Sequence, residues 1–361
     1  MESKSHEPTA LHEVPGINQP DTLSLKVVST IQQFRKKQPT ANELIEGILA
    51  QNITALSRAI TLVESTNSSH LEKANEVIHA CLPYANQSVR IGITGVPGVG
   101  KSTFIEAFGK YLTGIGKKVA VLAVDPSSSM SFGSILGDKT RMEELVKDPN
   151  AYIRPSPSGV TLGGVARKTR ETITLCEAFG YDTIIIETVG VGQSETAVHS
   201  MVDFFLLLKI AGAGDELQGI KRGIMEMADA IVINKADGDN IKKAQMAKVA
   251  FNRALHLFPA KKSGWIPTTA TCSALVQDGI SEVWDSILNY LDLTQNNGYF
   301  EEKRRDQNQY WMLETINESL KNSFFNKENI KNLLTINKKA VQDGTISPFA
   351  AAQILLQAYF E

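Results

Sequence analysis

A glycine-rich segment directly after a short apolar run constrains this chain most strongly. The run 89–94 (VRIGIT) is typical of a buried strand, and residues 95–103 read GVPGVGKST. The pattern G-x-x-x-x-G-K-S matches a Walker A motif, which has meaning only between a strand and a helix. Glycine lets backbone N–H groups curl around phosphate oxygens that a Cβ would obstruct. The segment therefore predicts a phosphate-binding loop.

Two side chains and the backbone of this loop are expected to act on the phosphates. Lys101 is placed to bridge the β- and γ-phosphates, and the hydroxyl of Ser102 to bind Mg²⁺. The helix that follows directs its positive amino end at the same charge. An ordinary glycine-rich turn is the alternative, and the flanking strand and helix patterns disfavour it. The nucleotide contacts expected here are Gly95, Gly98, Val99, Gly100, Lys101, Ser102 and Thr103.

Short apolar runs alternate with helical stretches between residues 88 and 295. Several runs are apolar throughout, as expected of parallel strands covered on both faces. This alternation predicts an α/β fold with a doubly wound, mostly parallel sheet, which is the fold class of a P-loop domain. The predicted strands are residues 89–94, 119–124, 183–187, 204–209, 230–234 and 265–269.

Both flanks of this domain have a different character. Residues 1–38 are polar and contain three prolines, which predicts a disordered tail. Residues 39–87 carry apolar side chains at helical spacing with a break at 66–70, which predicts an N-terminal helical hairpin. Residues 296–361 predict a C-terminal helical segment, in which Ser347 and Pro348 form a good N-cap and first-turn pair.

Composition excludes several classes of protein. The formal net charge of −2 argues against nucleic acid as the main partner. Three widely spaced cysteines indicate neither a disulfide framework nor a thiolate metal site. The sequence contains no apolar run long enough to span a bilayer, and its acidic first residues differ from a transit peptide. We expect a cytoplasmic protein.

A strand ending in Asn-Lys-x-Asp indicates which base is bound. The carboxylate of Asp237 can accept from guanine N1–H and the N2 amine, and adenine has neither donor there. Charge-assisted hydrogen bonds of about 1.5–3 kcal/mol each give a preference of at least roughly a hundredfold. Lys235 is expected along the base, and Asn234 is expected to brace the phosphate loop. A helix N-cap loop with solvated charges is the alternative. Residues expected to complete the base pocket are Ser273, Ala274 and Leu275.

Two further predicted strand ends carry acids. Asp125 follows the strand 119–124 at the edge where ligands bind, so it is a candidate Mg²⁺ ligand through water, or else a turn residue. Glu187 precedes Thr-Val-Gly in an element like the GTPase D-x-x-G, with Gly190 offering its N–H to the γ-phosphate. Glu187 can reach the Mg²⁺ shell or orient the attacking water. Gln193 and Glu195 are candidates in the mobile loop that follows.

Residues 209–222 (KIAGAGDELQGIKR) follow another predicted strand. Their glycines and mixed charges are equally well explained by a nucleotide-sensing switch and by a plain solvated loop.

Four segments taken together resemble one family. DPSSSMSFGSILGDKTRM, ETVGVGQSE, GAGDELQGIKRG and NKAD, in this order, are similar to the methylmalonyl-CoA mutase-associated GTPase chaperones (MeaB/MMAA type). These are P-loop GTPases of the SIMIBI class, formerly described as ArgK or LAO/AO (lysine/arginine/ornithine) transport ATPases. The resemblance covers residues 42–361.

The resemblance implies more than the residues do by themselves. It implies a homodimer formed by the C-terminal helices, although their apolar faces would equally suit packing on the chain's own core. It implies a partner, an adenosylcobalamin-dependent acyl-CoA mutase. The protein would gate loading of the cofactor into this mutase and protect the mutase from inactivation. Adenosylcobalamin is implied only as the cofactor of that partner. GTP hydrolysis would be slow and partner-stimulated. By the family pattern Lys101, Asp125 and Glu187 are catalytic, Ser102, Asp125 and Glu187 hold Mg²⁺, and the 209–222 loop is a switch.

Two other functions remain open at this point. One is an ATP-dependent kinase or energiser of arginine–ornithine transport, which would require Asn-Lys-Ala-Asp to be a coincidence. The other is a nucleotide-dependent scaffold that barely turns over. A metal-inserting relative is disfavoured because the chain has neither a His-rich tail nor a cysteine motif near these loops.

Overall fold

The computed structural model describes residues 38–124, 142–155, 162–188, 194–212 and 222–360. The chain divides into two units, Met1–Thr40 and Ala41–Glu361, and the elements described below belong to the second. The predicted tail, except for its last residue, lies outside the described residues, so its disorder stays a prediction.

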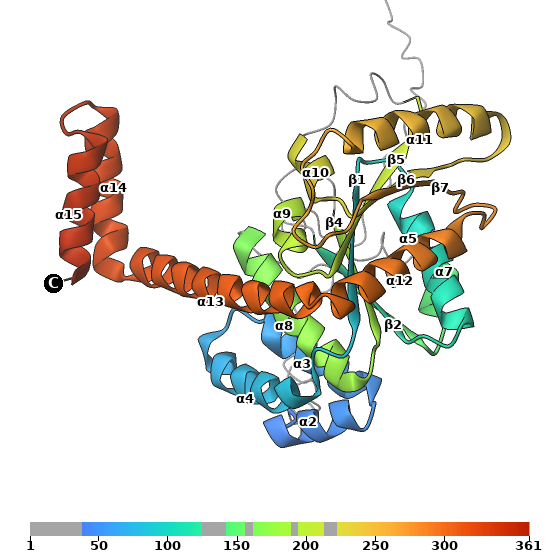
Figure 1. The fold of residues 1–361 in the computed structure, drawn as a ribbon. Helices are drawn as coiled ribbons and strands as arrows, with labels where there is room; N and C mark the ends of the chain where they lie inside the picture. The colour runs from blue at the N-terminus through green and yellow to red at the C-terminus, as the bar shows by residue number, and fades with distance from the viewer. Residues whose placement is uncertain (1–37, 125–141, 156–161, 189–193, 213–221, 361) are drawn as a thin grey trace, which may run out of the picture. The chain divides into compact units, whose positions relative to one another are not determined.

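The centre of the second unit is a parallel sheet (Figure 1). Within the described ranges it has seven strands in the order β3-β2-β4-β1-β5-β6-β7, with every neighbouring pair parallel. The doubly wound parallel sheet predicted from the sequence is confirmed. The strands are β1 Val89–Gly95, β2 Val119–Val124, β3 Ala151–Arg154, β4 Thr183–Thr188, β5 Phe204–Ile210, β6 Ala230–Asn234 and β7 Thr268–Thr271.

Two details of the strand prediction were wrong. The edge strand β3 was not predicted, because four residues are too few for a periodicity to show. The last strand begins at Thr268 rather than Trp265, since Pro267 has no N–H to donate to a ladder. The side chain of Trp265 instead donates from Nε1 to the carbonyl of Asp229 at 2.9 Å.

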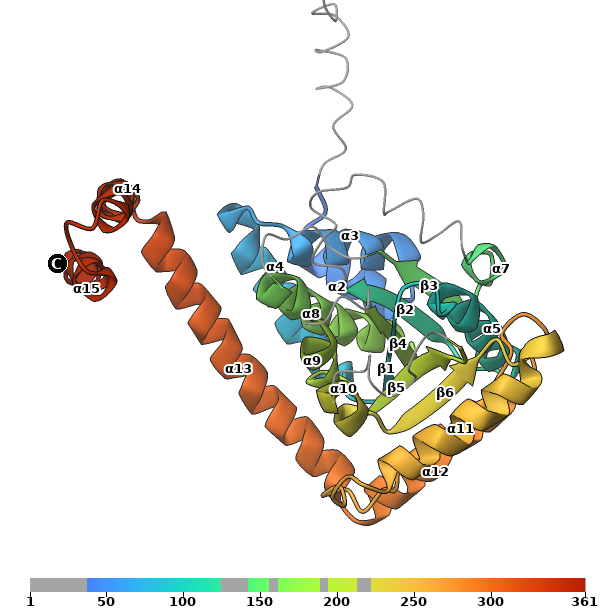
Figure 2. The same ribbon diagram turned by 90° about the horizontal axis from the view of Figure 1, so that it is seen from above.

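Helices cover both faces of the sheet (Figure 2). Strand β2 shows the division: Val121 packs in a core with α5 and α12, while Ala120 and Leu122 pack in a core with α8. A third cluster joins β5 and β6 to α11. The helices of this region are α5 Lys101–Gly114, α7 Glu143–Val146, α8 Leu162–Phe179, α9 Ser194–His199, α10 Arg222–Met227, α11 Ile241–Leu255 and α12 Ile280–Asn296, with a 3-10 turn η3 at Gly238–Asn240.

The N-terminal segment is a set of three α-helices rather than the predicted hairpin. These are α2 Ala41–Leu49, α3 Ile53–Glu64 and α4 Leu71–Cys81, with 3-10 turns η1 Ser68–His70 and η2 Leu82–Tyr84. The unpredicted break lies at Gln51, whose φ is +57°, and at Asn52. The side chain of Asn52 caps α3 by accepting from Thr54 N at 2.9 Å and Ala55 N at 3.2 Å.

Three helices follow the sheet: α13 Tyr299–Asn326, α14 Glu328–Gln342 and α15 Pro348–Phe360. The hydroxyl of Ser347 accepts from Ala350 N at 3.2 Å, which is the N-cap that the Ser347–Pro348 pair predicts. The last two helices are joined through Gly344, whose φ of +68° suits glycine. No helix in the described ranges combines the length and apolarity needed to cross a membrane.

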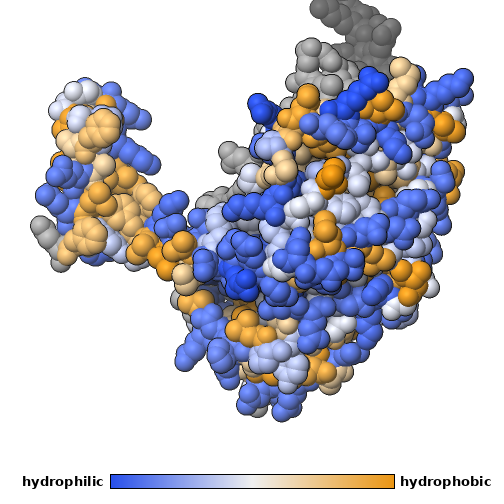
Figure 3. Space-filling view, viewed as in Figure 1, coloured by the Kyte–Doolittle hydropathy of each residue, from blue (hydrophilic) through white to orange (hydrophobic). Residues whose placement is uncertain are grey.

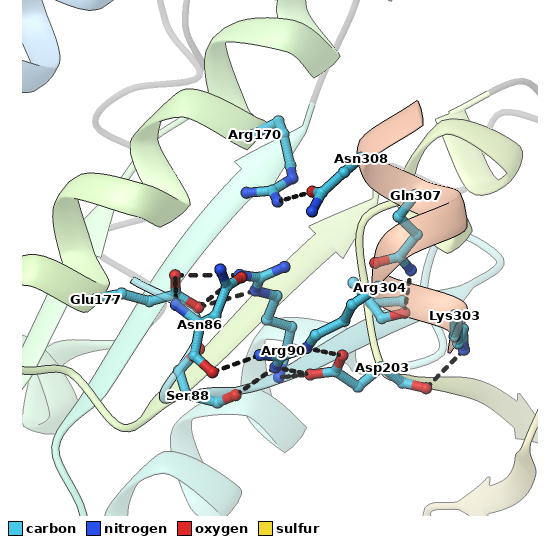
Figure 4. A network of polar contacts seen from close by, with 11 residues as sticks. Asn86, Ser88, Arg90, Arg170, Glu177, Asp203, Lys303, Arg304, Gln307 and Asn308 are labelled. Atoms are coloured by element: carbon cyan, nitrogen blue, oxygen red, sulfur yellow. Dashed lines mark hydrogen bonds and ion pairs between the residues drawn. The ribbon is translucent and has the colours of Figure 1, made fainter. Parts of the chain in front are cut away.

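A buried ion network fixes the start of α13 to the body (Figure 4). Arg304 donates from Nε and Nη2 to Asp203 at 2.9 and 2.7 Å, and further to the carbonyls of Asn86 and Ser88 at 2.6 Å each. Lys303 donates to the carbonyl of Asp203 at 2.7 Å. Because Asp203 directly precedes β5, this joint lies at the amino edge of the sheet.

A second ion pair continues the network into the sheet. Arg90 of β1 donates to Glu177 of α8 from Nε at 2.9 Å, and both side chains are buried. The backbone N–H of Arg90 donates to Asp203 at 2.8 Å, so β1, α8 and α13 share one set of charges.

Candidate functional site

The predicted site residues that the structure describes gather at the carboxyl edge of the sheet, the edge opposite the ion network. The loop after β1 enters α5 directly, with Gly100 as N-cap and Lys101 as the first helical residue. Open parallel sheets bind ligands at this edge, in the crevice beside a central strand such as β1. The β1–loop–α5 arrangement is the context that gives the glycine-rich motif its meaning.

Three glycines give the loop a shape that other residues would not keep. Gly98 and Gly100 have φ angles of +81° and +91°, in the left-handed region. A Cβ on Gly95 would lie 2.6 Å from the carbonyl oxygen of Leu208, and a Cβ on Gly100 would lie 2.9 Å from Nδ2 of Asn234. By contrast, nothing lies within 4 Å of the Cβ position of Gly98. The loop thus packs closely at its ends and is open at Gly98.

Lys101 lies folded against this loop. Its side chain is buried, and Nζ donates to the carbonyl oxygen of Gly95 at 2.8 Å and of Val96 at 3.5 Å. The amino end of α5 begins at the same residue, and first-turn N–H groups have no acceptor within their own helix. An anion at this point would meet one ammonium and several N–H donors. Ser102 is half-buried beside them, Thr103 is exposed, and the side chain of Val99 is in the core.

The Asn-Lys-Ala-Asp segment lies directly against the loop. Asn234 donates from Nδ2 to the carbonyl of Val99 at 2.9 Å, and Lys235 donates from Nζ to the carbonyl of Gly98 at 2.9 Å. Lys235 has φ +59°, an uncommon angle for a residue with a Cβ, and Asn240 donates to its carbonyl at 2.7 Å. Two consecutive residues at the end of β6 therefore hold the loop from one side.

The segment after β7 completes this side of the site. The buried Oδ1 of Asn234 accepts from Ala274 N at 3.3 Å and from the thiol of Cys272 at 3.5 Å. Burial raises the pKa of that thiol to about 12, so it stays a neutral donor. Ser273 donates its hydroxyl to Asp237. Leu275 is 78 % exposed, so only its backbone is placed to line a pocket.

On the metal side the structure describes part of the predicted set. Glu187 is half-buried in β4, in register with Ile93 of β1 and Ala123 of β2. Asp125 and Gly190 lie outside the described residues.

Sequence reasoning missed one contact here. Thr188, next to Glu187, donates its hydroxyl to that of Thr94 at 2.8 Å, and both residues are buried. The bond joins the end of β4 to the residue before the glycine-rich loop. A threonine at a strand end is too common to be singled out in a sequence.

One switch candidate is corrected. Glu195 does not lie in a mobile loop but in the first turn of α9, where it is 2 % exposed. Gln193 lies outside the described residues. Most of the 209–222 segment also lies outside the described residues. Its first two residues belong to β5, and its last residue, Arg222, begins α10.

The fold and the loop define a P-loop protein of the GTPase class: a parallel sheet, a Walker A loop between β1 and α5, and Asn-Lys-Ala-Asp bound to that loop. The family model described as "Methylmalonyl Co-A mutase-associated GTPase MeaB" matches residues 56–329. The chain belongs to that family.

Individual relatives agree with this assignment. The chain is 45 % identical over 311 residues to GTPase ArgK of Escherichia coli, covering 86 % of this chain and 94 % of that protein. It is 45 % identical over 334 residues to the mouse protein "Methylmalonic aciduria type A homolog, mitochondrial", covering 90 % and 80 %. A crystal structure described as "LAO/AO transport system kinase" matches with a TM-score of 0.72 and 38 % identity, over 90 % of this chain and 99 % of that one.

Proposed function

We propose that this GTPase is a chaperone of an adenosylcobalamin-dependent acyl-CoA mutase of the methylmalonyl-CoA mutase type, gating cofactor loading and protecting the mutase from inactivation. Membership of the mutase-associated family carries this proposal. The geometry supports its nucleotide half, because Asn234 and Lys235 bind the same loop that presents Lys101 to a phosphate.

The proposed chemistry is stabilisation of charge on a transferring phosphoryl group. Lys101 would exchange its carbonyl partners for β- and γ-phosphate oxygens, and α5 would add its N–H donors. Mg²⁺, when bound, neutralises charge on the same oxygens. The residues proposed to hold it are Ser102, Asp125 and Glu187, a hydroxyl and two carboxylates, which is an oxygen set that suits this ion.

Hydrolysis is proposed to be slow in the chain alone and faster with the partner. Val191 follows Gly190, so the glutamine that orients water in many GTPases is not at the next position. Gly190 is proposed to sense the γ-phosphate, and the 209–222 loop to respond to the mutase.

The proposed location is the cytoplasm, where the three buried cysteines, which are free thiols in the structure, would stay reduced.

A homodimer through the C-terminal helices is part of the proposal. Exposed apolar side chains run along α13, α14 and α15, and Figure 3 shows hydrophobic residues gathered on the α14–α15 hairpin. Their exposure fits a second protomer better than packing on the chain's own core, because solvent-facing patches of this kind mark interaction sites. Examples are Met312, Ile316, Leu320, Ile336, Phe349, Ile354 and Phe360.

The proposal is tested by the survival of a mutase during turnover. A methylmalonyl-CoA mutase loaded with adenosylcobalamin should lose activity more slowly when the wild-type chain and GTP are present than with the Lys101→Ala variant and GTP. Equal rates of loss with the two proteins would contradict the chaperone role.

One observation favours a second candidate. The similar crystal structure is described as a transport-system kinase, which corresponds to an ATP-dependent energiser of arginine–ornithine transport. The two candidates differ in the nucleotide base that would donate hydrogen bonds to Asp237. Tighter binding of ATP than of GTP would favour the kinase.

A further inference from the structure

The segment from α11 to the start of β7 has an unusual charge distribution. Residues 241–267 contain six of the chain's 37 Lys and Arg residues and none of its 39 Asp and Glu residues. One of the six, Lys261, is paired with Asp229, so five cationic side chains remain as a local positive region on a chain whose net charge is −2. Such a region attracts an acidic partner and speeds its association.

The outer face of α11 combines this charge with exposed apolar groups. Lys242, Met246, Val249 and Arg253 follow one another on α11 at intervals of three or four residues, so they form one stripe, and Leu257 continues it two residues beyond the end of the helix. Met246 is 73 % exposed and Leu257 is 86 % exposed. In the surface over α11, hydrophobic and hydrophilic residues alternate (Figure 3). The buried side of α11 belongs to a core cluster with β5 and β6, and the residues of this stripe are not among its members.

A groove of about 370 Å³ lies next to this stripe, between α10 and the connection from α11 to β7. Met225, Phe258, Trp265 and Pro267 give it apolar walls, and Ile266 at its rim is 73 % exposed. Glu226 also lines it, so the proposed acidic contacts lie along the α11 stripe and the inserted side chain is apolar. The two sides of the groove are joined, since Lys261 donates to the carbonyls of Met227, the last residue of α10, and of Ala228, at 3.1 and 2.8 Å, and also to Asp229. The hollow is therefore part of the fold.

The groove is connected to the nucleotide site through α10. Arg222, the first residue of α10, lies over the ring of Phe258 with 5.8 Å to the centroid. Met225 of α10, which lines the groove, packs in one core cluster with Leu207 of β5 and Ile233 of β6, the residue before Asn234. A partner in the groove would press on Phe258 and α10, and so act on the strand that ends at Asn234.

We propose that this groove and the α11 stripe form the docking surface for the regulatory partner protein. The partner presents an acidic segment, whose charges face Arg253 and its neighbours, and one apolar side chain that enters the groove beside Ile266. The inference rests on the proposed function in taking that partner to be the mutase. A protein fits better than a lipid surface or nucleic acid, because a groove with apolar walls needs an inserted side chain.

The test uses the full-length chain and a purified adenosylcobalamin-dependent methylmalonyl-CoA mutase from the same organism. Ile266→Asp and Leu257→Asp should each weaken mutase binding by about tenfold or more in calorimetry. They should also reduce the stimulation of GTP hydrolysis, with basal hydrolysis unchanged. Leu71→Asp is the matched control, because Leu71 is an exposed apolar helix residue on α4 and outside the proposed surface.

The charge is tested separately. Arg253→Glu should weaken binding and flatten its dependence on salt, whereas Arg58→Glu, at an exposed arginine of α3, should do neither. If Ile266→Asp, Leu257→Asp and Arg253→Glu all bind the mutase as tightly as the wild type does, the docking surface is overturned. The proposed function is left intact by that result. If the wild-type chain fails to bind the mutase, the proposed function fails and the docking surface fails with it. Loss of binding to anionic vesicles or duplex DNA in Arg253→Glu, with mutase binding intact, would also overturn it.

Discussion

At the scale of single residues, the site depends on side chains that each connect several segments. Asn234 contacts the loop through Nδ2 and the segment after β7 through Oδ1, so its amide fixes both at once. Its buried amide has a partner at each end, which is how a buried polar group avoids a large desolvation cost. Lys101 and Asp237 are the site residues whose chemistry can be tested most directly.

Replacing Lys101 by alanine removes the ammonium that the loop presents. We expect Lys101→Ala to abolish GTP binding or turnover, because the remaining N–H donors carry no full charge to offset the phosphates. Calorimetric titration with GTP and a phosphate-release assay measure the two effects. The thermal unfolding midpoint serves as the control for folding, and unchanged turnover in a folded variant would contradict the loop's role.

Replacing Asp237 by asparagine reverses part of the hydrogen-bonding pattern at the base. The amide offers a donor where guanine itself has donors, so we expect Asp237→Asn to lose at least about a hundredfold in GTP affinity. Selection should relax towards xanthine nucleotides, which have an acceptor at that position. Competition between GTP and xanthosine triphosphate measures this, with Asp239→Asn, at an exposed carboxylate of the adjacent turn, as the control. Unaltered GTP affinity would show that another group reads the base.

The residue positions of this site were predictable where a motif fixes spacing and chemistry together. The contacts of Asn234 and Lys235 with the loop could be predicted because both motifs follow strands of one parallel sheet and therefore lie at the same edge. The Thr94–Thr188 bond was not predictable, because it depends on the register of β1 against β4. Binding roles for the site residues stay predictions, including those of Asp125 and Gly190.

At the scale of elements, α13 is held by buried charge rather than by an apolar face alone. Burial by itself raises the pKa of Asp203, but the adjacent Arg304 guanidinium outweighs it and holds the pKa below its usual value. The carboxylate is fully buried between Arg304 and the backbone of Arg90. Removing one partner of such a pair leaves the other charge uncompensated.

Asp203→Asn is expected to lower the free energy of unfolding by about 3–5 kcal/mol near neutral pH. Because the folded-state pKa is depressed, the stabilisation by Asp203 is complete above the unfolded pKa of about 4 and is lost as pH falls through the folded value. The variant should therefore show a smaller loss of stability than the wild type on acidification. Urea unfolding at several pH values checks this, with exposed Asp285→Asn as control. Parallel pH profiles would contradict it.

Long periodic helices and buried strands were predictable because their patterns repeat over many residues. The errors lie where one or two residues decide the outcome. Pro267 moves the start of β7, and the left-handed Gln51 with the capping Asn52 divides one predicted helix into α2 and α3. The ion network also escaped prediction, since Asn86, Arg90, Glu177, Asp203 and Arg304 are far apart in sequence and adjacent only after folding.

At the scale of the whole molecule, nucleotide and partner are proposed to act through one sheet. The carboxyl edge holds the loop, the amino edge anchors α13, and the groove is lined by α10 and by the connection from α11 to β7. The exposed apolar side chains of α13 to α15 remain outside this core and are proposed to be covered by a second protomer.

The dimer makes a specific prediction. Ile354→Asp and Leu320→Asp, each at an exposed apolar position, should shift the chain from twice the monomer mass to the monomer mass in light scattering. Nucleotide affinity should be retained, because neither residue is near the loop. A wild-type chain that is monomeric at micromolar concentration would contradict the assembly.

The most direct test of the central claim is the rate of GTP hydrolysis with and without a stoichiometric adenosylcobalamin-dependent methylmalonyl-CoA mutase, with ATP measured in parallel. The account predicts slow hydrolysis of GTP by the chain alone, a clear rise when the mutase is added, and little hydrolysis of ATP under either condition. A GTP rate that the mutase leaves unchanged, or a preference for ATP, would contradict it.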